Sequence, residues 1–170
     1  MSAEPAAPSA APSTTATTAD IPVVVAYDFS PVADEALRRA VELACLAPQH
    51  VLHVAAAIHP DSGLALAPTK HITSEYIAWA QHTIAARVAD MVNGRAHADR
   101  VRYGVHVRVG RAASEILALA GELGAALVFI GSHNRTGAEK AALGSVSDRV
   151  TREARCSVVV AHQRASSTSR

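Results

Sequence analysis

The chain has 170 residues and a formal net charge of +1; 49% of its residues are hydrophobic and 18% are charged. These values are typical of one globular domain with a core of ordinary size. The near-neutral charge, with no basic cluster, argues against nucleic acid or an anionic membrane as a partner. No apolar run reaches the roughly 20 residues that a membrane-spanning helix needs. The two isolated cysteines, Cys45 and Cys156, fit a reducing compartment, so we expect a cytoplasmic protein.

Both ends of the chain differ in composition from the middle. Residues 1–20 are rich in Ala, Pro, Ser and Thr and lack the basic and leucine-rich segments of a secretory signal. We predict a disordered tail over residues 1–20, one domain over residues 21–163 and a second disordered tail over residues 164–170.

The first predicted strand covers Pro22 to Tyr27, a continuous apolar run of the kind that is buried inside a parallel sheet. Ser30 suits a helix N-cap and Pro31 the first helical position. The helix that follows should end before Pro48. Its expected buried stripe has helical spacing and consists of Ala33, Ala36, Leu37, Ala40, Val41 and Ala44.

A second buried strand is predicted over Val51 to Ala57, followed by a long loop over residues 59–73. A helix from Ser74 to Val92 should end at Asn93-Gly94. The expected buried face of this helix consists of Ile77, Ala80, Ile84, Val88 and Met91. Val101 to Val109 alternates apolar with polar residues, so we expect this strand to have one wet face and to lie at an edge of the sheet.

The last third of the chain predicts a helix from Ala113 to Gly121 or beyond and a buried strand over Ala125 to Ile130. The helix should bury Ile116, Leu119, Ala120 and Leu123. A further helix over Ser145 to Ala154 and a strand over Ser157 to Ala161 complete the chain. The alternation predicts an α/β fold, a five-stranded parallel doubly wound sheet with helices on both faces. With the alternating strand at one edge, the strand order is 3-2-1-4-5. Ligands should then bind between the ends of the first and fourth strands, beside Asp28 and Gly131.

The stretch from Leu127 to Val150 has the pattern of a phosphate site: an apolar strand, a glycine-bearing loop and a helix start. Gly131 is followed after two residues by Asn134 and, nine residues later, by Gly144 and Ser145. Main-chain N–H groups and the helix dipole of such a loop favour an anion. Ser145 and Asp148 also have the spacing of a capping box. A Walker A loop, a GxGxxG fingerprint and a GxSxG elbow are all absent from the sequence.

Four segments of the chain resemble the universal stress protein family, in particular its nucleotide-binding branch. They are DFSPVADEAL, VGRAASEIL, GSHNRTG and GSVSDRV, and the resemblance covers residues 21–162. The ATP-binding members carry Gly, two residues, Gly, nine residues, Gly and then Ser or Thr. Here Asn134 stands in place of the second glycine. Asparagine is the least costly non-glycine residue in a left-handed conformation, so the loop can keep its shape while the side chain crowds the phosphates.

The resemblance implies an ATP site, with or without Mg²⁺, and a role for each matching residue. Asp28 would meet the adenine or ribose, Val54 would pack near the base and Gly131 would lie against the ribose. The residues implied around the triphosphate are Asn134, Gly144, Ser145, Val146 and Ser147, with Arg135 adding charge; Ala26 and Ile130 complete the candidate set. The implied function is a stress-response regulator that binds nucleotide as a homodimer and hydrolyses it slowly at most.

Three alternatives stay open. Asp28 can simply help to start the first helix, because Asp and Ser are common there. The chain can be a dimeric protein-interaction module that has lost its nucleotide site through Asn134, or an enzyme that uses Asp28. The nine histidines contain no HExxH or HxH pattern, so we expect no metal site.

The last strand lacks the lysine or proline that usually protects a sheet edge, which favours pairing with a second copy. The resemblance also implies a homodimer through Ser157 to Ala161. The sequence identifies no protein partner.

Overall fold

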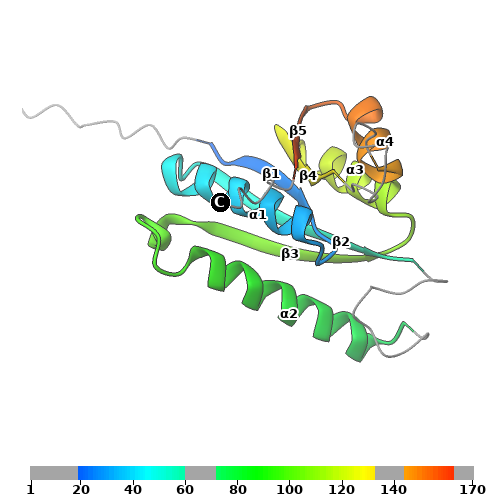
Figure 1. Cartoon of the computed structure of the whole chain (residues 1–170), viewed down its shortest axis with the longest axis horizontal. Coiled ribbons are helices and arrows are strands. Elements are labelled where there is room, and N and C mark those ends of the chain that lie inside the picture. The colour runs from blue at the N-terminus through cyan, green and yellow to red at the C-terminus, as the bar shows by residue number, and fades with distance from the viewer. Residues whose placement is uncertain (1–18, 60–71, 133–143, 163–170) are drawn as a thin grey trace, which may run out of the picture.

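A five-stranded parallel sheet forms the centre of the molecule, with helices on both faces (Figure 1). The computed structural model describes residues 19–59, 72–132 and 144–162. In chain order the elements are β1 (Ile21–Ala26), α1 (Pro31–Leu46), β2 (His50–Ile58), α2 (Ser74–Val92), η1 (Ala98–Arg100), β3 (Arg102–Val109), α3 (Ala112–Leu123), β4 (Leu127–Gly131), α4 (Ser145–Glu153) and β5 (Ser157–Ala161). The strand order is β3-β2-β1-β4-β5, so the predicted fold class and the predicted order 3-2-1-4-5 are both confirmed.

The strand boundaries differ from the predicted ones by one or two residues. β1 covers Ile21–Ala26 instead of residues 22–27, and β2 covers His50–Ile58 instead of residues 51–57. β2 is longer because it pairs with β3 as far as Ile58 and Val109. β4 begins at Leu127, two residues later than predicted, because the N–H of Ala125 still donates to the carbonyl of Ala120 and closes α3.

α1 begins as its sequence predicts. The hydroxyl of Ser30 accepts a hydrogen bond from the N–H of Ala33 at 3.2 Å, and Pro31 is the first helical residue. All six residues of the predicted stripe are buried, together with Val32 and Cys45. This face packs with α2 on one side of the sheet, in the cluster that contains Val23, Val25 and Leu52. Burying this stripe holds the first turn of α1 at the carboxyl end of β1.

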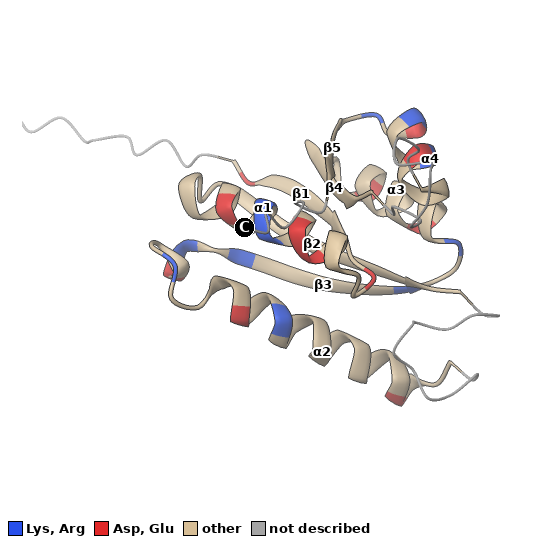
Figure 2. Cartoon of the chain, viewed as in Figure 1, with Lys and Arg blue, Asp and Glu red and all other residues tan. Residues whose placement is uncertain are grey.

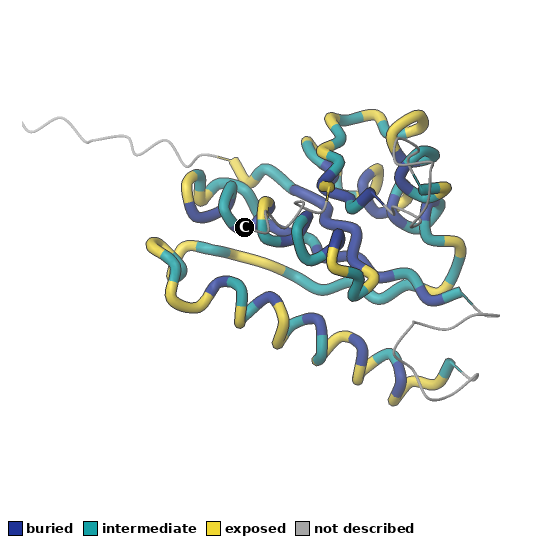
Figure 3. The backbone as a smooth tube through the Cα atoms, viewed as in Figure 1, coloured by how far each residue is buried: buried dark blue, intermediate teal, exposed yellow. Residues whose placement is uncertain are grey.

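α2 has the predicted bounds, and its buried face is rotated slightly from the predicted one. The buried residues recur every fourth position: Tyr76, Ala80, Ile84, Val88 and Val92. Ile77 and Met91 are only half-buried, because the row spaced by four residues is the one that faces the sheet. Figure 3 shows this row as one buried segment per turn of the helix.

β3 lies at an edge of the sheet, as its alternating pattern predicts. The contrast between its two faces is weaker than predicted. Tyr103 and Val109, on the apolar face, are 38% and 46% exposed. On the polar face Arg108 is half-buried, because its guanidinium reaches the carboxylate of Glu122 on α3. The extended arginine therefore covers part of the face that the alternation predicts to be wet.

α3 and α4 cover the other face of the sheet. α3 covers Ala112–Leu123, longer than its minimum prediction, and buries Ala113, Ile116, Leu119 and Ala120, while Leu123 is partly buried. These residues pack with Val24, Val128 and Ile130. Among the described residues, no helix is long and apolar enough to cross a membrane.

Candidate functional site

The carboxyl ends of β1 and β4 meet at the switch point of the sheet. Val25 pairs with Phe129 in register, so the next residues along, Ala26 and Ile130, lie level with each other. Both are buried in the cluster that α3 and α4 cover. β1 continues into α1 on one face of the sheet, whereas α4, the next described helix after β4, lies on the other face. Ala26 and Ile130 therefore lie at the switch point, where a doubly wound sheet is expected to bind a ligand.

The turn between β1 and α1 has a fixed and unusual backbone. Phe29 has a φ of +65°, in the left-handed region that non-glycine residues rarely adopt. The ring of Phe29 lies edge-on to Tyr27 with 5.1 Å between centroids. The N–H of Ser30 donates to the carboxylate of Asp28 at 3.0 Å. Asp28 therefore helps to form the turn that starts α1, which is the first of the three alternatives given above. Its side chain is also exposed, just beyond the end of β1.

Gly131 is required by packing against α1. A Cβ at this position would lie 2.7 Å from the carbonyl carbon of Val32 and 2.9 Å from the nitrogen of Ala33. Both neighbours belong to the first turn of α1, which is backbone that cannot rotate away. The missing side chain of Gly131 therefore sets how closely β4 approaches α1 at the switch point.

Ser132 and His162 form a pair that the sequence analysis did not identify. The N–H of Ser132 donates to the carbonyl of Ala161 at 2.7 Å, and its hydroxyl lies 2.7 Å from Nδ1 of His162. Ser132 is 1% exposed. Because Gly131 pairs with Ala161, the residues that follow β4 and β5 lie level with each other. The pair could have been predicted from this strand register alone. It joins the residue that follows β4 to the residue that follows β5.

The start of α4 differs from the predicted capping box. The N-cap residue is Gly144, which has no side chain with which to cap the helix. Asp148 instead forms an ion pair with Arg152 at 2.6 Å. The N–H of Asp148 donates to the carbonyl of Gly144, so the helical hydrogen bonds begin there. The N–H groups of the first turn therefore receive no hydrogen bond from the side chain of the N-cap residue, and they point out along the helix axis.

The first turn of α4 lies beside the crevice. Val146 packs against the cluster that contains Ala26 and Ile130, while Ser145 is exposed. Ser147 is 2% exposed, and its hydroxyl donates to the carbonyl of Gly144 at 3.0 Å. In this arrangement Ser147 would offer a ligand its main-chain N–H, while its hydroxyl is committed to the helix start.

The remaining predicted residues stand apart. Val54 is wholly buried in the cluster on the α1 side of the sheet, where its side chain packs against protein. Asn134 and Arg135 lie outside the described residues, so their roles stay predictions.

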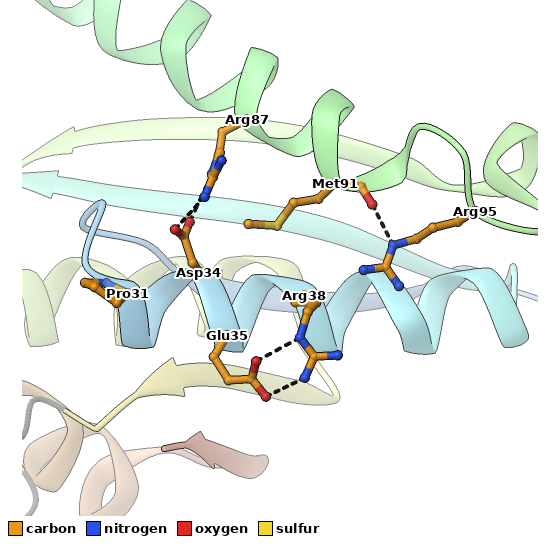
Figure 4. A pocket seen from close by; sticks show the side chains of 7 residues that line it. All are labelled: Pro31, Asp34, Glu35, Arg38, Arg87, Met91 and Arg95. Carbon is orange, nitrogen blue, oxygen red and sulfur yellow. Dashed lines mark hydrogen bonds and ion pairs between the residues drawn. The ribbon is translucent and has the colours of Figure 1, made fainter. Parts of the chain in front are cut away.

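A second feature outside the prediction is the open groove between α1 and α2, which has a volume of about 400 Å³ (Figure 4). Arg87 of α2 donates to Asp34 of α1 at 2.6 Å, and Asp34 also accepts from the Tyr27 hydroxyl at 2.7 Å. Burial and the neighbouring Asp34 raise the pKa of Tyr27. Hydrogen bonding to Arg38 lowers the pKa of Glu35 to about 2. The three arginines that line the groove, Arg38, Arg87 and Arg95, each form an ion pair with a carboxylate of α1, so their positive charge is largely neutralised (Figure 2).

The sheet order and its switch point define a doubly wound α/β protein, a class that binds ligands at the carboxyl ends of its strands. Within this class the chain belongs to the universal stress protein family, whose sequence profile matches residues 22–162. No curated protein is similar enough in sequence to match the chain.

Solved structures of universal stress proteins have the same fold. One from Archaeoglobus fulgidus is 25% identical, with a TM-score of 0.59; the match covers 83% of this chain and 98% of that one. A universal stress protein in complex with cAMP is 23% identical, covers 85% and 98% of the two chains and has a TM-score of 0.61. One from Archaeoglobus fulgidus in complex with dAMP is 23% identical, covers 85% and 99% and has a TM-score of 0.58.

Proposed function

We propose that this chain is a cytoplasmic, ATP-binding regulatory protein of the stress response, which signals through bound nucleotide as a homodimer. The observation that carries the proposal is the start of α4. Its N-cap is a glycine, which has no capping side chain of its own, and its first turn packs beside the buried ends of β1 and β4. Main-chain N–H groups and the helix dipole would there favour a phosphate group, with or without Mg²⁺.

Two related structures support a nucleotide as the ligand. Relatives with this fold are described as complexes with cAMP and with dAMP, both of which pair an adenine base with a phosphate group. In this chain the exposed carboxylate of Asp28 lies at the rim where a base or ribose would lie. The strained turn at Phe29 fixes that rim before any ligand arrives. The sequence has no Walker lysine and no nucleophile elbow, so we propose that nucleotide is held as a signal and hydrolysed slowly at most.

Placing a negative charge at the start of α4 should weaken ATP binding without weakening the fold. Ser145 is exposed and is the first residue of the helix, so Ser145→Asp should stabilise α4 by about 0.3–1 kcal/mol. The same charge should repel phosphates by about 1.7 kcal/mol at roughly 10 Å and an effective dielectric constant of about 20, which is more than tenfold in affinity. Isothermal titration calorimetry with ATP and Mg²⁺ measures this loss.

The chain offers a matched control for that variant. Ser74 is likewise exposed and is the first residue of α2. Ser74→Asp makes the same change in charge at a helix start, so it should leave ATP affinity unchanged. Equal weakening by both variants would show a general charge effect, and no weakening by Ser145→Asp would remove α4 from the phosphate site.

The second candidate function is a dimeric interaction module that has lost its nucleotide site, and Asn134 is the observation that favours it. We expect the wild type to bind ATP, and Asn134→Gly to bind at least as tightly, because glycine removes the side chain that crowds the phosphates. Calorimetric titration of both proteins separates the candidates. Binding by the Asn134→Gly variant alone would indicate a site blocked by asparagine, and binding by neither would indicate that the site is lost.

The proposed homodimer forms through β5, which pairs only with β4 among the described strands. Val159 is 37% exposed on this edge, whereas Val158 and Val160 pack against the cluster under α3 and α4. An unprotected apolar edge strand favours pairing with another strand. A second copy related by a two-fold axis is the simplest partner.

A further inference from the structure

Two histidines from adjacent strands lie side by side on the sheet. Nδ1 of His53 is 3.0 Å from Nε2 of His106, with 5.2 Å between the ring centroids. His53 pairs in register with Gly104, and His106 pairs with Ala55, so the two histidines are diagonal neighbours on β2 and β3. HxH and HExxH spacings do not reveal this pair, because it is the register between β2 and β3 that brings the two histidines together.

The pair faces the α3 side of the sheet. His53 alternates along β2 with Leu52 and Val54, which are buried on the α1 side, so its ring points to the opposite face. Both histidines are half-buried. Arg108 of β3 and Glu122 of α3, which bind each other, are the charged groups that act on His106.

Both rings are suited to act as neutral ligands at pH 7. Burial lowers the pKa of His53 below its usual value of 6.5. Burial, together with His53 and Arg108, lowers the pKa of His106, and Glu122 acts in the opposite direction. Neutral imidazole is the form that binds a metal ion. The ring that donates the present hydrogen bond would have to carry its proton on its other nitrogen, which is a change of tautomer.

The distance between the two nitrogens matches a chelating pair. Imidazole nitrogens bind zinc at about 2.0–2.1 Å, so two of them at angles between about 90° and 109° lie roughly 2.9–3.4 Å apart. The 3.0 Å between His53 Nδ1 and His106 Nε2, which are joined by a hydrogen bond in this structure, falls in that interval, so a metal ion could replace the shared proton without moving the two strands. The outer torsion of histidine is broad, so each ring can rotate by the roughly 35–45° that turns its lone pair from the other nitrogen toward a shared metal ion.

We propose that His53 and His106 form a binding site for a divalent late-transition-metal ion, in which two imidazole nitrogens are the protein ligands and water completes the coordination shell. Among the described residues no group of three or more histidines, cysteines and carboxylates could hold a metal ion, so the site is an open, two-ligand one. Copper(II) binds such nitrogen ligands more tightly than nickel or zinc. The site lies between β2 and β3 and does not depend on the proposed nucleotide function.

Copper(II) is the probe that tests this proposal. The wild-type protein, titrated with copper(II) in a glycine-buffered solution, should take up one tightly bound ion per chain. Electron paramagnetic resonance should show coupling to two imidazole nitrogens, and the melting temperature should rise with copper. His106→Asn should lose the two-imidazole signal and the rise in melting temperature, and its affinity should fall by more than about tenfold, since losing even an outer partner of a metal ligand costs 10–100-fold.

Two further variants make the result decisive. His53→Gln removes the other ligand and should give the same loss, which guards against a folding defect that is specific to one substitution. His82 is exposed on α2, and His82→Asn should leave the copper affinity and the spectrum unchanged. The proposal is wrong if His106→Asn and His53→Gln, both folded by circular dichroism, keep the wild-type affinity and the two-nitrogen spectrum. A wild-type spectrum with a single imidazole would also overturn it.

Discussion

Gly131→Ala should destabilise the protein by about 1–3 kcal/mol, the usual cost of forcing an extra carbon into a packed site. The added Cβ would lie 2.7 Å from the carbonyl carbon of Val32, closer than such atoms approach in real structures. The carbonyl carbon of Val32 and the nitrogen of Ala33 are both main-chain atoms of α1. The end of β4 and the start of α1 must therefore move apart. Urea unfolding followed by circular dichroism measures the change in the free energy of unfolding.

Gly121 provides the control with the opposite sign. It lies exposed near the end of α3, and a Cβ there would meet nothing within 4 Å. Gly121→Ala should therefore stabilise the protein by about 0.5–1 kcal/mol, because alanine loses less conformational entropy in a helix. A loss of stability in both variants, or in neither, would contradict the role given to the contact between Gly131 and Val32.

The same substitution would also affect the candidate site. α1 begins directly after the turn that carries Asp28 and Phe29, so displacing its first turn displaces the rim of the crevice. If ATP binds at this crevice, Gly131→Ala should weaken binding even at temperatures at which the protein is fully folded. Glycine at position 131 thus keeps the first turn of α1 in place, and the proposed ligand would depend on that same turn.

The fold could be predicted from the sequence because its main signals are local. Ser30-Pro31 marks the start of α1, the apolar runs mark buried strands, and the alternation of residues 101–109 marks the edge strand that fixes the order of the sheet. The errors arose where a boundary depends on a neighbouring element. β2 is extended by its pairing with β3, and the start of β4 is delayed by the hydrogen bond that closes α3.

The candidate site was harder to predict, because its features depend on register and on competing hydrogen bonds. The Ser145 and Asp148 spacing suggested a capping box, yet Asp148 pairs with Arg152 and the cap is Gly144. The pairs of Ser132 with His162 and of His53 with His106 join residues far apart in the sequence. Such contacts follow only from a known strand register, which a spacing motif does not contain.

Val159→Lys should convert the proposed homodimer into a monomer. β5 runs from Ser157 to Ala161, so Val159 is its central residue. When two copies of a strand pair antiparallel about a two-fold axis at their centre, the central residue lies opposite its own copy. Two lysines would then face each other directly, and like charges placed opposite each other destabilise a strand pair.

Lysine is also a residue with which natural proteins block edge pairing. Light scattering after gel filtration should give one chain mass of 17.7 kDa for the variant and twice that mass for the wild type.

The opposite edge of the sheet supplies the matched control. Val109, at the end of β3, is 46% exposed, so Val109→Lys places the same charge on the same type of residue at the other edge. That variant should remain a dimer, because β3 takes no part in the proposed interface. A third variant, Val159→Thr, keeps the branched shape without a charge and should also remain a dimer.

If Val159→Lys stays dimeric while folded, β5 is not the interface. If Val109→Lys alone becomes monomeric, the pairing strand is β3. The geometry favours β5, because Val158 and Val160, on either side of Val159, pack against the core. The side chain of Val159 is therefore available to contact a partner.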